Sequence, residues 1–225
     1  MEICTTLGMQ HAIAWTFDCL GWTAWCQGDL ATAQNYLQDA LALYRTLGMP
    51  ADVSMCLSEL ALVWRSAGET EQAVVVAREA VAICRDTENQ MRLILNLNYL
   101  GAALIGTGEL APARQTLLEV IPRAQADHVG FLLIALYYFA ELLVLESHAA
   151  NLPGSLERQA LAVALLSCVR TQTATWQIFK DKAVQLQAQI EGTLPAELCA
   201  TALARGKSCT LEEMVNALLD AVDTE

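Results

Sequence analysis

The residues of this chain that could bind a metal ion or act as nucleophiles are eight cysteines and three histidines. The cysteines contain no C-x-x-C pair and no closely spaced Cys/His cluster, so no metal site is predicted. Cys4 and Cys84 each lie forty residues from Tyr44, and this shared repeat position indicates thiols that fill a core. We therefore expect reduced, mostly buried thiols, as in a cytoplasmic protein.

Arrangements that could carry out catalysis are also missing from the sequence. Asp127 and His128 are adjacent, but neighbouring residues on a helix point in different directions. His11 and His148 have no Cys, Asp or Glu cluster beside them. Neither a G-x-S-x-G nucleophile pattern nor a G-x-x-x-x-G-K-(S/T) phosphate loop occurs. We expect no enzymatic activity and no cofactor.

Three tryptophans, Trp15, Trp22 and Trp25, lie on one face of a predicted helix. Tryptophan is a frequent anchor in interfaces because it buries a large area at a small cost in entropy. One interpretation is an aromatic wall that binds a peptide or a small apolar ligand. The alternative is that the indoles pack against an upstream hairpin that is missing from the chain, or against its own C-terminal cap.

The helices that position these residues follow from a period of forty residues. Gly28, Gly68 and Gly108 each follow an apolar segment and precede Asp or Glu. Glycine permits a left-handed helix end, and an acidic residue favours the start of the next helix. Each unit then forms an antiparallel hairpin of helices A and B that cannot bury its apolar face alone. The predicted fold is all-α, a right-handed superhelix of such hairpins (an α-α solenoid) with a helical C-terminal cap.

The period also predicts where the repeats begin and end. We expect repeats over residues 10–171, divided into 10–49, 50–89, 90–127 and a degenerate unit 128–171. Residues 172–225 form the predicted cap, with helices over 175–191, 195–204 and 210–222. Leu7-Gly8-Met9 matches Leu47-Gly48-Met49, so residues 1–9 are interpreted as the end of a preceding repeat in a longer protein. A natural start at Met1 with a frayed lead-in is the alternative.

Helix packing in a hairpin divides the surface of helix A into two sides. We expect Phe17, Leu20 and Ala24 to face the core, and Gly21 to pass close to Ala33 of helix B. The opposite side of helix A lines the concave groove. The candidate groove residues are Trp15, Asp18, Trp22, Trp25, Arg65, Asn98 and Tyr138.

Composition excludes several classes of partner. The chain has 55% apolar residues, which suits closely packed helices, and its net charge of −12 argues against nucleic-acid binding. The apolar segment 129–145 is interrupted by Glu141 and is shorter than the roughly 20 residues of a membrane span, so we expect a buried helix. No secretory signal precedes the first predicted helix. We expect a cytoplasmic protein that binds no membrane.

The unit Leu20-Gly21…Gly28-Asp29…Ala33…Leu37…Ala40 resembles the tetratricopeptide repeat. It is similar to the long-helix variant, with units near forty residues, of the large bacterial signal-transduction (STAND-type) ATPases and transcriptional regulators such as the maltose-regulon activator. Residues 197–222, with Ala204-Arg205-Gly206 and Thr210-Leu211-Glu212-Glu213, resemble the ending that follows those repeats. Met214 departs from that ending, which usually has Ala.

The resemblance implies a sensor or scaffold region without enzymatic activity. Such a region would bind a protein, a peptide or a small signal molecule in its concave groove, and nucleotide hydrolysis would lie upstream in the same polypeptide. The alternative is a stand-alone adaptor that binds a partner protein or self-associates through its exposed N-terminal edge.

Overall fold

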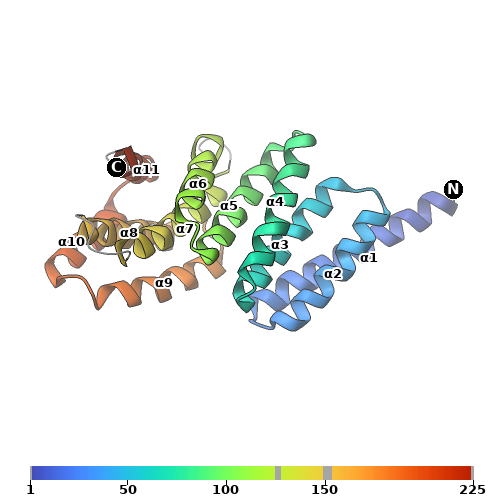
Figure 1. Ribbon diagram of the computed structural model, residues 1–225, viewed down its shortest axis with the longest axis horizontal. Coiled ribbons are helices and arrows are strands. Elements are labelled where there is room, and N and C mark those ends of the chain that lie inside the picture. The colour runs from blue at the N-terminus through green and yellow to red at the C-terminus, as the bar shows by residue number, and fades with distance from the viewer. Residues whose placement is uncertain (1, 125–127, 149–153, 224–225) are drawn as a thin grey trace. The chain divides into compact units, whose positions relative to one another are not determined.

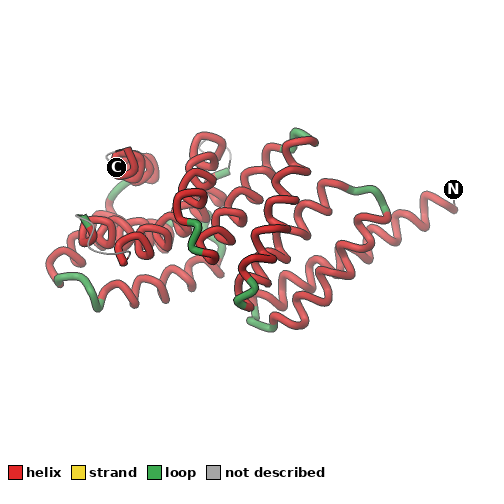
Figure 2. The backbone as a smooth tube through the Cα atoms, in the orientation of Figure 1, coloured by secondary structure: helices red, strands yellow, loops and turns green. Residues whose placement is uncertain are grey.

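The computed structural model describes residues 2–124, 128–148 and 154–223, with side chains from residue 8 onward in the first helix. These residues form eleven α-helices joined by short loops and no strand, which confirms the all-α prediction (Figure 2). The chain divides into two compact units, Met1–Thr116 and Leu117–Glu225, and the division falls within helix α6 (Leu110–Ala124).

Unit 1 is a stack of antiparallel hairpins (Figure 1). Its helices before α6 are α1 (Glu2–Cys26), α2 (Leu30–Thr46), α3 (Pro50–Ala67), α4 (Thr70–Asp86) and α5 (Gln90–Thr107). Helices α2 and α4 begin forty residues apart, and so do α3 and α5. Each helix packs against the next, and α3 also packs against α5. This arrangement confirms the α-solenoid prediction.

The glycines of the repeat end the A helices as predicted. Gly28, Gly68 and Gly108 have φ angles of 82°, 85° and 80°, in the left-handed region that favours glycine. The next helix then begins at once. Asp29, for example, is the N-cap of α2, and its Oδ1 accepts a hydrogen bond from the Thr32 backbone N–H at 3.1 Å.

The close crossing within the first hairpin is also present. A Cβ added at Gly21 of α1 would lie 2.6 Å from Leu37 Cγ and 3.3 Å from the Ala33 carbonyl oxygen of α2. Ala33 and Leu37 are both fully buried. Helices α1 and α2 therefore approach so closely at this point that only glycine fits without rearrangement.

The helix break expected at Leu7-Gly8-Met9 is wrong, because α1 runs continuously from Glu2 to Cys26. The matching Gly48 has a left-handed φ of 67° and is followed by Pro50 at the start of α3. Proline has no N–H to continue a helix, whereas Gln10, at the corresponding position, has one. The local sequence match lacked the residue that stops the helix.

Unit 2 is built around one central helix. Its helices after α6 are α7 (Val129–His148), α8 (Ser155–Thr171), α9 (Gln177–Glu191), α10 (Ala196–Ser208) and α11 (Leu211–Asp223). Helix α8 packs against α7, α9, α10 and α11. Helix α7 is long and apolar enough to cross a membrane, but 72% of that stretch is buried inside the structure, as in a core helix.

The C-terminal helices follow their sequence signals with small differences. Phe179, Ala183 and Ile190 form the buried stripe of α9. Thr210 and Glu213 form a capping box at the start of α11: Glu213 N–H donates to Thr210 Oγ1 at 3.2 Å, and Thr210 N–H donates to Glu213 Oε2 at 2.7 Å. Helix α10 continues to Ser208, four residues beyond the predicted end at 204.

The described cysteines are free thiols. Cys56, Cys84, Cys168 and Cys199 are buried, Cys209 is partly exposed, and Cys19 and Cys26 of α1 are exposed. Cys84 is a core residue, as predicted, and the side chain of Cys4 lies outside the described residues.

Candidate functional site

Large apolar side chains are exposed along one side of α1, the first helix of unit 1. Met9, Ile13 and Leu20 are each more than 40% exposed, and Thr16 between them is also exposed. We call the surface formed by Met9, Ile13, Thr16 and Leu20, which are three or four residues apart and share one side of the helix, the α1 face. Trp15 is 61% exposed but lies on another side of α1, next to Asp18. Single exposed apolar residues are ordinary, but several on one face of a helix mark an interaction surface.

The forty-residue period shows how unusual this exposure is within the chain. Ile13 is 46% exposed, whereas its counterpart Val53 in α3 is 7% exposed. Leu20 is 41% exposed, whereas Leu60 in α3 is 1% exposed. The prediction that Leu20 faces the core is therefore wrong, although the same position is buried in the following repeat.

Hydrogen bonds identify what covers this face in the later repeats. Cys56 Sγ of α3 donates to the Leu37 carbonyl of α2 at 3.0 Å. Asn96 of α5 donates through Nδ2 to the Ala80 carbonyl of α4 at 3.3 Å. The corresponding residue of α1, Thr16, is exposed and donates to the Ala12 carbonyl of its own helix at 2.7 Å. In α3 and α5 this position contacts helix B of the preceding hairpin, whereas among the described residues no such helix lies on this side of α1.

The α1 face carries no charged side chain. Asp18 is the only acidic or basic residue, apart from His11, between residues 3 and 28. Its carboxyl group lies against that of Glu59 of α3 and is therefore on the other side of the helix. On a chain of net charge −12, this face can meet an apolar surface without burying a charge.

The three tryptophans do not form one exposed wall. Trp15 is exposed, Trp22 is half-buried, and Trp25 is buried at 6% exposure. The Trp22 and Trp25 rings lie 4.9 Å apart, and Trp25 Nε1 donates to Ser66 Oγ of α3 at 3.1 Å. Trp25 therefore joins the first two hairpins, a contact that neither the aromatic wall nor the packing alternative predicted.

The other candidate groove residues are spread over both units. Arg65 is half-buried in α3, and its stem lies against α5: a Cβ added at Gly106 would be 3.4 Å from Arg65 Cγ. Asn98 is fully buried in α5 and donates to the Ile94 carbonyl at 3.2 Å.

Tyr138 is a core residue of unit 2. It is 1% exposed, and its ring lies 5.1 Å from that of Tyr137 and 5.9 Å from that of Phe179 in α9. The position of Tyr138 in its repeat is therefore covered by α9, which sequence periodicity did not place there.

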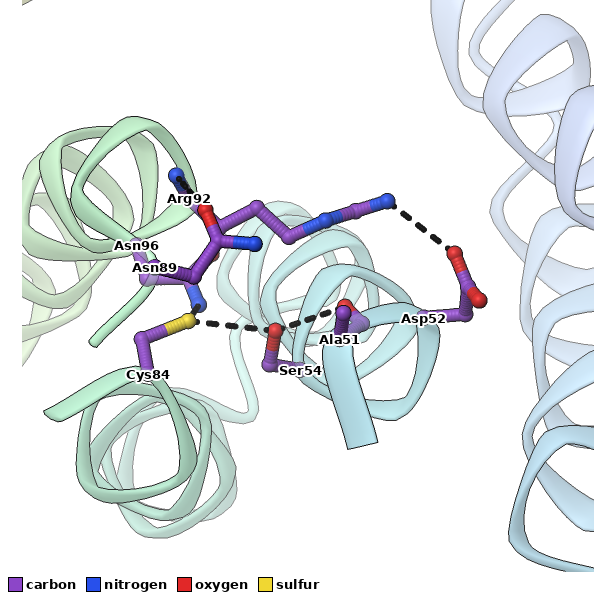
Figure 3. Close-up of polar contacts among 7 residues, drawn as sticks. All are labelled: Ala51, Asp52, Ser54, Cys84, Asn89, Arg92 and Asn96. Carbon is purple, nitrogen blue, oxygen red and sulfur yellow. Dashed lines mark hydrogen bonds and ion pairs between the residues drawn. The ribbon is translucent and has the colours of Figure 1, made fainter. Parts of the chain in front are cut away.

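Polar residues link the hairpins of unit 1 on the inside of the stack. Arg92 of α5 donates through Nη2 to Asp52 Oδ1 of α3 at 3.0 Å, and both side chains are 22% exposed (Figure 3). The two residues are forty positions apart, so they occupy the same place in consecutive repeats. An aspartate at this position of one repeat and an arginine at the same position of the next were the sequence signal that could have identified this ion pair.

A second link in the same view runs through sulfur. Asn96 Nδ2 donates to Cys84 Sγ at 3.1 Å, Cys84 Sγ donates to Ser54 Oγ at 3.2 Å, and Ser54 Oγ donates to the Ala51 carbonyl at 2.8 Å (Figure 3). This chain joins α5, α4 and α3 around a buried thiol. It holds the stack together and offers no exposed group for chemistry.

Asp18 and Glu59 form a buried carboxyl pair that the sequence analysis did not identify. Glu59 is 6% exposed within α3. Burial raises its pKa well above the usual range, and the neighbouring Asp18 carboxylate raises it further. Burial also raises the pKa of Asp18. Asp18, one of the predicted groove residues, therefore lies at the contact between α1 and α3.

Comparison with protein families agrees with the geometry of unit 1. The model of the tetratricopeptide repeat family matches residues 13–47 and 53–89. This segment is a tetratricopeptide repeat region. Tetratricopeptide repeats are generally protein-interaction modules rather than enzymes, and the two matched segments cover the first two hairpins, including most of the α1 face. No curated protein matches the chain.

Proposed function

We propose that the chain is a non-enzymatic protein-interaction module and that its α1 face binds an apolar helix of a partner protein. The observation that carries this proposal is the difference in burial between matching positions. Ile13 and Leu20 are exposed, whereas Val53 and Leu60 are covered in the next repeat. The partner helix takes the place on α1 that α2 takes on α3.

The contacts of α2 with α3 define the kind of helix that fits. It has an apolar stripe with a small residue at the crossing, and it carries no charge toward the uncharged α1 face. Ile13 and Leu20 are the anchors of this interface, because they are the exposed apolar side chains whose counterparts are covered in the next repeat. Replacing an anchor of this kind weakens binding by roughly 10- to 100-fold.

Site-specific photo-crosslinking in cells tests this proposal. A crosslinker at Thr16 should capture a protein that the same crosslinker at Val75, an exposed residue of α4, does not capture. The captured protein, once purified, should bind the wild-type chain and lose about tenfold or more in affinity with Leu20→Ala. Equal capture at both positions, or an affinity unchanged by Leu20→Ala, contradicts the proposal.

We also propose that the partner helix belongs to the same polypeptide, in the upstream region of a bacterial regulatory ATPase. The support is the resemblance of the repeats and tail, together with an α1 face that matches the stacking surface of the later repeats. Sequencing the gene upstream of Met1 tests this. Further repeats and a phosphate-binding loop are expected, and a stop codon directly ahead of Met1 would remove the ATPase hypothesis.

Self-association through the same face is the second candidate function. Two copies with a net charge of −12 repel each other over most of their surface but can meet at an uncharged helix. Sedimentation equilibrium distinguishes the candidates. Dimers that dissociate with Leu20→Asp support self-association, whereas a monomer at about 100 μM, far above a micromolar Kd, contradicts it.

A further inference from the structure

Asp18 of α1 and Glu59 of α3 contact each other through their carboxyl groups. Asp18 Oδ1 and Glu59 Oε2 are both buried, and neither accepts a hydrogen bond from an N–H or O–H donor of the described residues. A buried acceptor without a donor is costly. One proton held between the two carboxyl groups satisfies both oxygens, because a protonated carboxyl group donates and an ionised one accepts.

The charge balance around the pair also favours one retained proton. The nearest guanidinium is that of Arg92, which is bonded to Asp52 Oδ1 at 3.0 Å. Without the shared proton, the carboxylates of Asp18, Glu59 and Asp52 would surround one cation. Two carboxylates in contact at a buried position repel each other, and this repulsion disfavours ionisation of both.

The Cys56 thiol also lies against Asp18, but it donates its proton to the Leu37 carbonyl at 3.0 Å. Burial, followed by the nearby carboxylates, raises the pKa of Tyr44, Cys56 and Cys19, so these groups stay neutral around pH 7. The titratable and charged residues that face the pair are Cys19 of α1, Tyr44 and Arg45 of α2, Asp52 and Cys56 of α3, and Arg92 of α5.

We propose that Asp18 and Glu59 share one proton at neutral pH and that this proton fastens α1 to α3. Loss of the proton at alkaline pH places two carboxylates against each other and loosens α1. This proton-dependent joint controls how firmly the α1 face is held on the repeat stack. It rests on the contact between α1 and α3 and not on the identity of any partner.

The direction of the pH effect follows from the raised pKa of Glu59. In the unfolded chain this group ionises at an ordinary value near 4.3, whereas in the folded chain it keeps its proton to higher pH. The stabilisation is fully present below the unfolded value and is lost as the pH rises toward the folded value. One proton corresponds to a tenfold increase in the opening constant per pH unit in this window.

Hydrogen exchange of α1 in the full chain measures this opening directly. Protection factors for residues 14–26, corrected for the intrinsic effect of pH, should fall by up to about tenfold per pH unit as the pH rises above about 5, relative to α5. Glu59→Gln should remove this dependence, because the glutamine amide donates to Asp18 at every pH. Glu71→Gln, at an exposed position of α4, is the matched control and should behave as wild type.

Asp18→Asn repeats the test from the other helix and should also flatten the profile. The proposal is overturned if Glu59→Gln or Asp18→Asn keeps the wild-type slope. It is also overturned if both amide variants lose protection at pH 6, where the shared proton is present in the wild type. Neither outcome affects the proposal for partner binding, which is tested by crosslinking at Thr16.

Discussion

The close crossing of α1 and α2 gives a sharp prediction about two glycines of the same helix. At Gly8 an added Cβ meets nothing within 4 Å, whereas at Gly21 it lies 2.6 Å from Leu37 Cγ and 2.9 Å from Leu37 Cδ2. Favourable carbon contacts lie at about 3.5–4.0 Å. Leu37 is fully buried, so its side chain cannot turn away without displacing its neighbours.

The magnitude follows from two terms. Replacing glycine by alanine within a helix stabilises by roughly 0.5–1 kcal/mol, so Gly8→Ala should raise the free energy of unfolding by up to that amount. Gly21→Ala gains the same propensity but overpacks the crossing, which costs about 1–3 kcal/mol. The two variants should therefore differ in stability by about 1–3 kcal/mol, with Gly21→Ala the less stable.

Urea unfolding followed by circular dichroism at 222 nm measures both variants. Combining Gly21→Ala with Leu37→Ala is the control, because the smaller side chain removes the clash. Leu37→Ala alone should cost about 2–5 kcal/mol, and adding Gly21→Ala should then cost little or nothing more. If Gly21→Ala stabilises the chain as much as Gly8→Ala does, the reasoning about the crossing is refuted.

Two further predictions concern the links between hairpins. Separate and combined alanine substitutions of Arg92 and Asp52 should show a coupling of about 0.5–2 kcal/mol in unfolding experiments, and additive effects would contradict a direct ion pair. Trp25→Phe should lose the hydrogen bond to Ser66 and lower the free energy of unfolding by about 0.5–1.5 kcal/mol. The same loss with Ser66→Ala, and no further loss in the double variant, would confirm that the two residues act as one bond.

The repeat period predicted most of the backbone of unit 1. Gly28, Gly68 and Gly108 mark helix ends because glycine alone tolerates their left-handed φ angles, and this requirement is local. The period failed at Gly8. The segment around Gly8 matches the one around Gly48, but it is not followed by a proline like Pro50, the residue that stops continuation of the helix. Local signals were therefore reliable only where the complete stop signal was present.

The side-chain environments were less predictable, because they depend on which neighbours surround each helix. Leu20 and Leu60 occupy the same repeat position, but only Leu60 has a preceding hairpin to cover it. Asp18 and Glu59 are forty-one residues apart, so a search for matching positions does not pair them. Tyr138 is buried by α9, which lies outside the repeat period. Such contacts between helices cannot be predicted from the repeat period of the sequence.

The central claim is that the α1 face is a stacking surface left open in the first repeat and covered in the next. The most direct test compares unfolding free energies of Leu20→Asp and Leu60→Asp, which place the same charge at the same repeat position. We predict a loss within about 1 kcal/mol for Leu20→Asp, mostly from helix propensity. For Leu60→Asp we predict a loss of about 4 kcal/mol or more, from a buried unpaired charge. Equal losses for the two variants would contradict the claim.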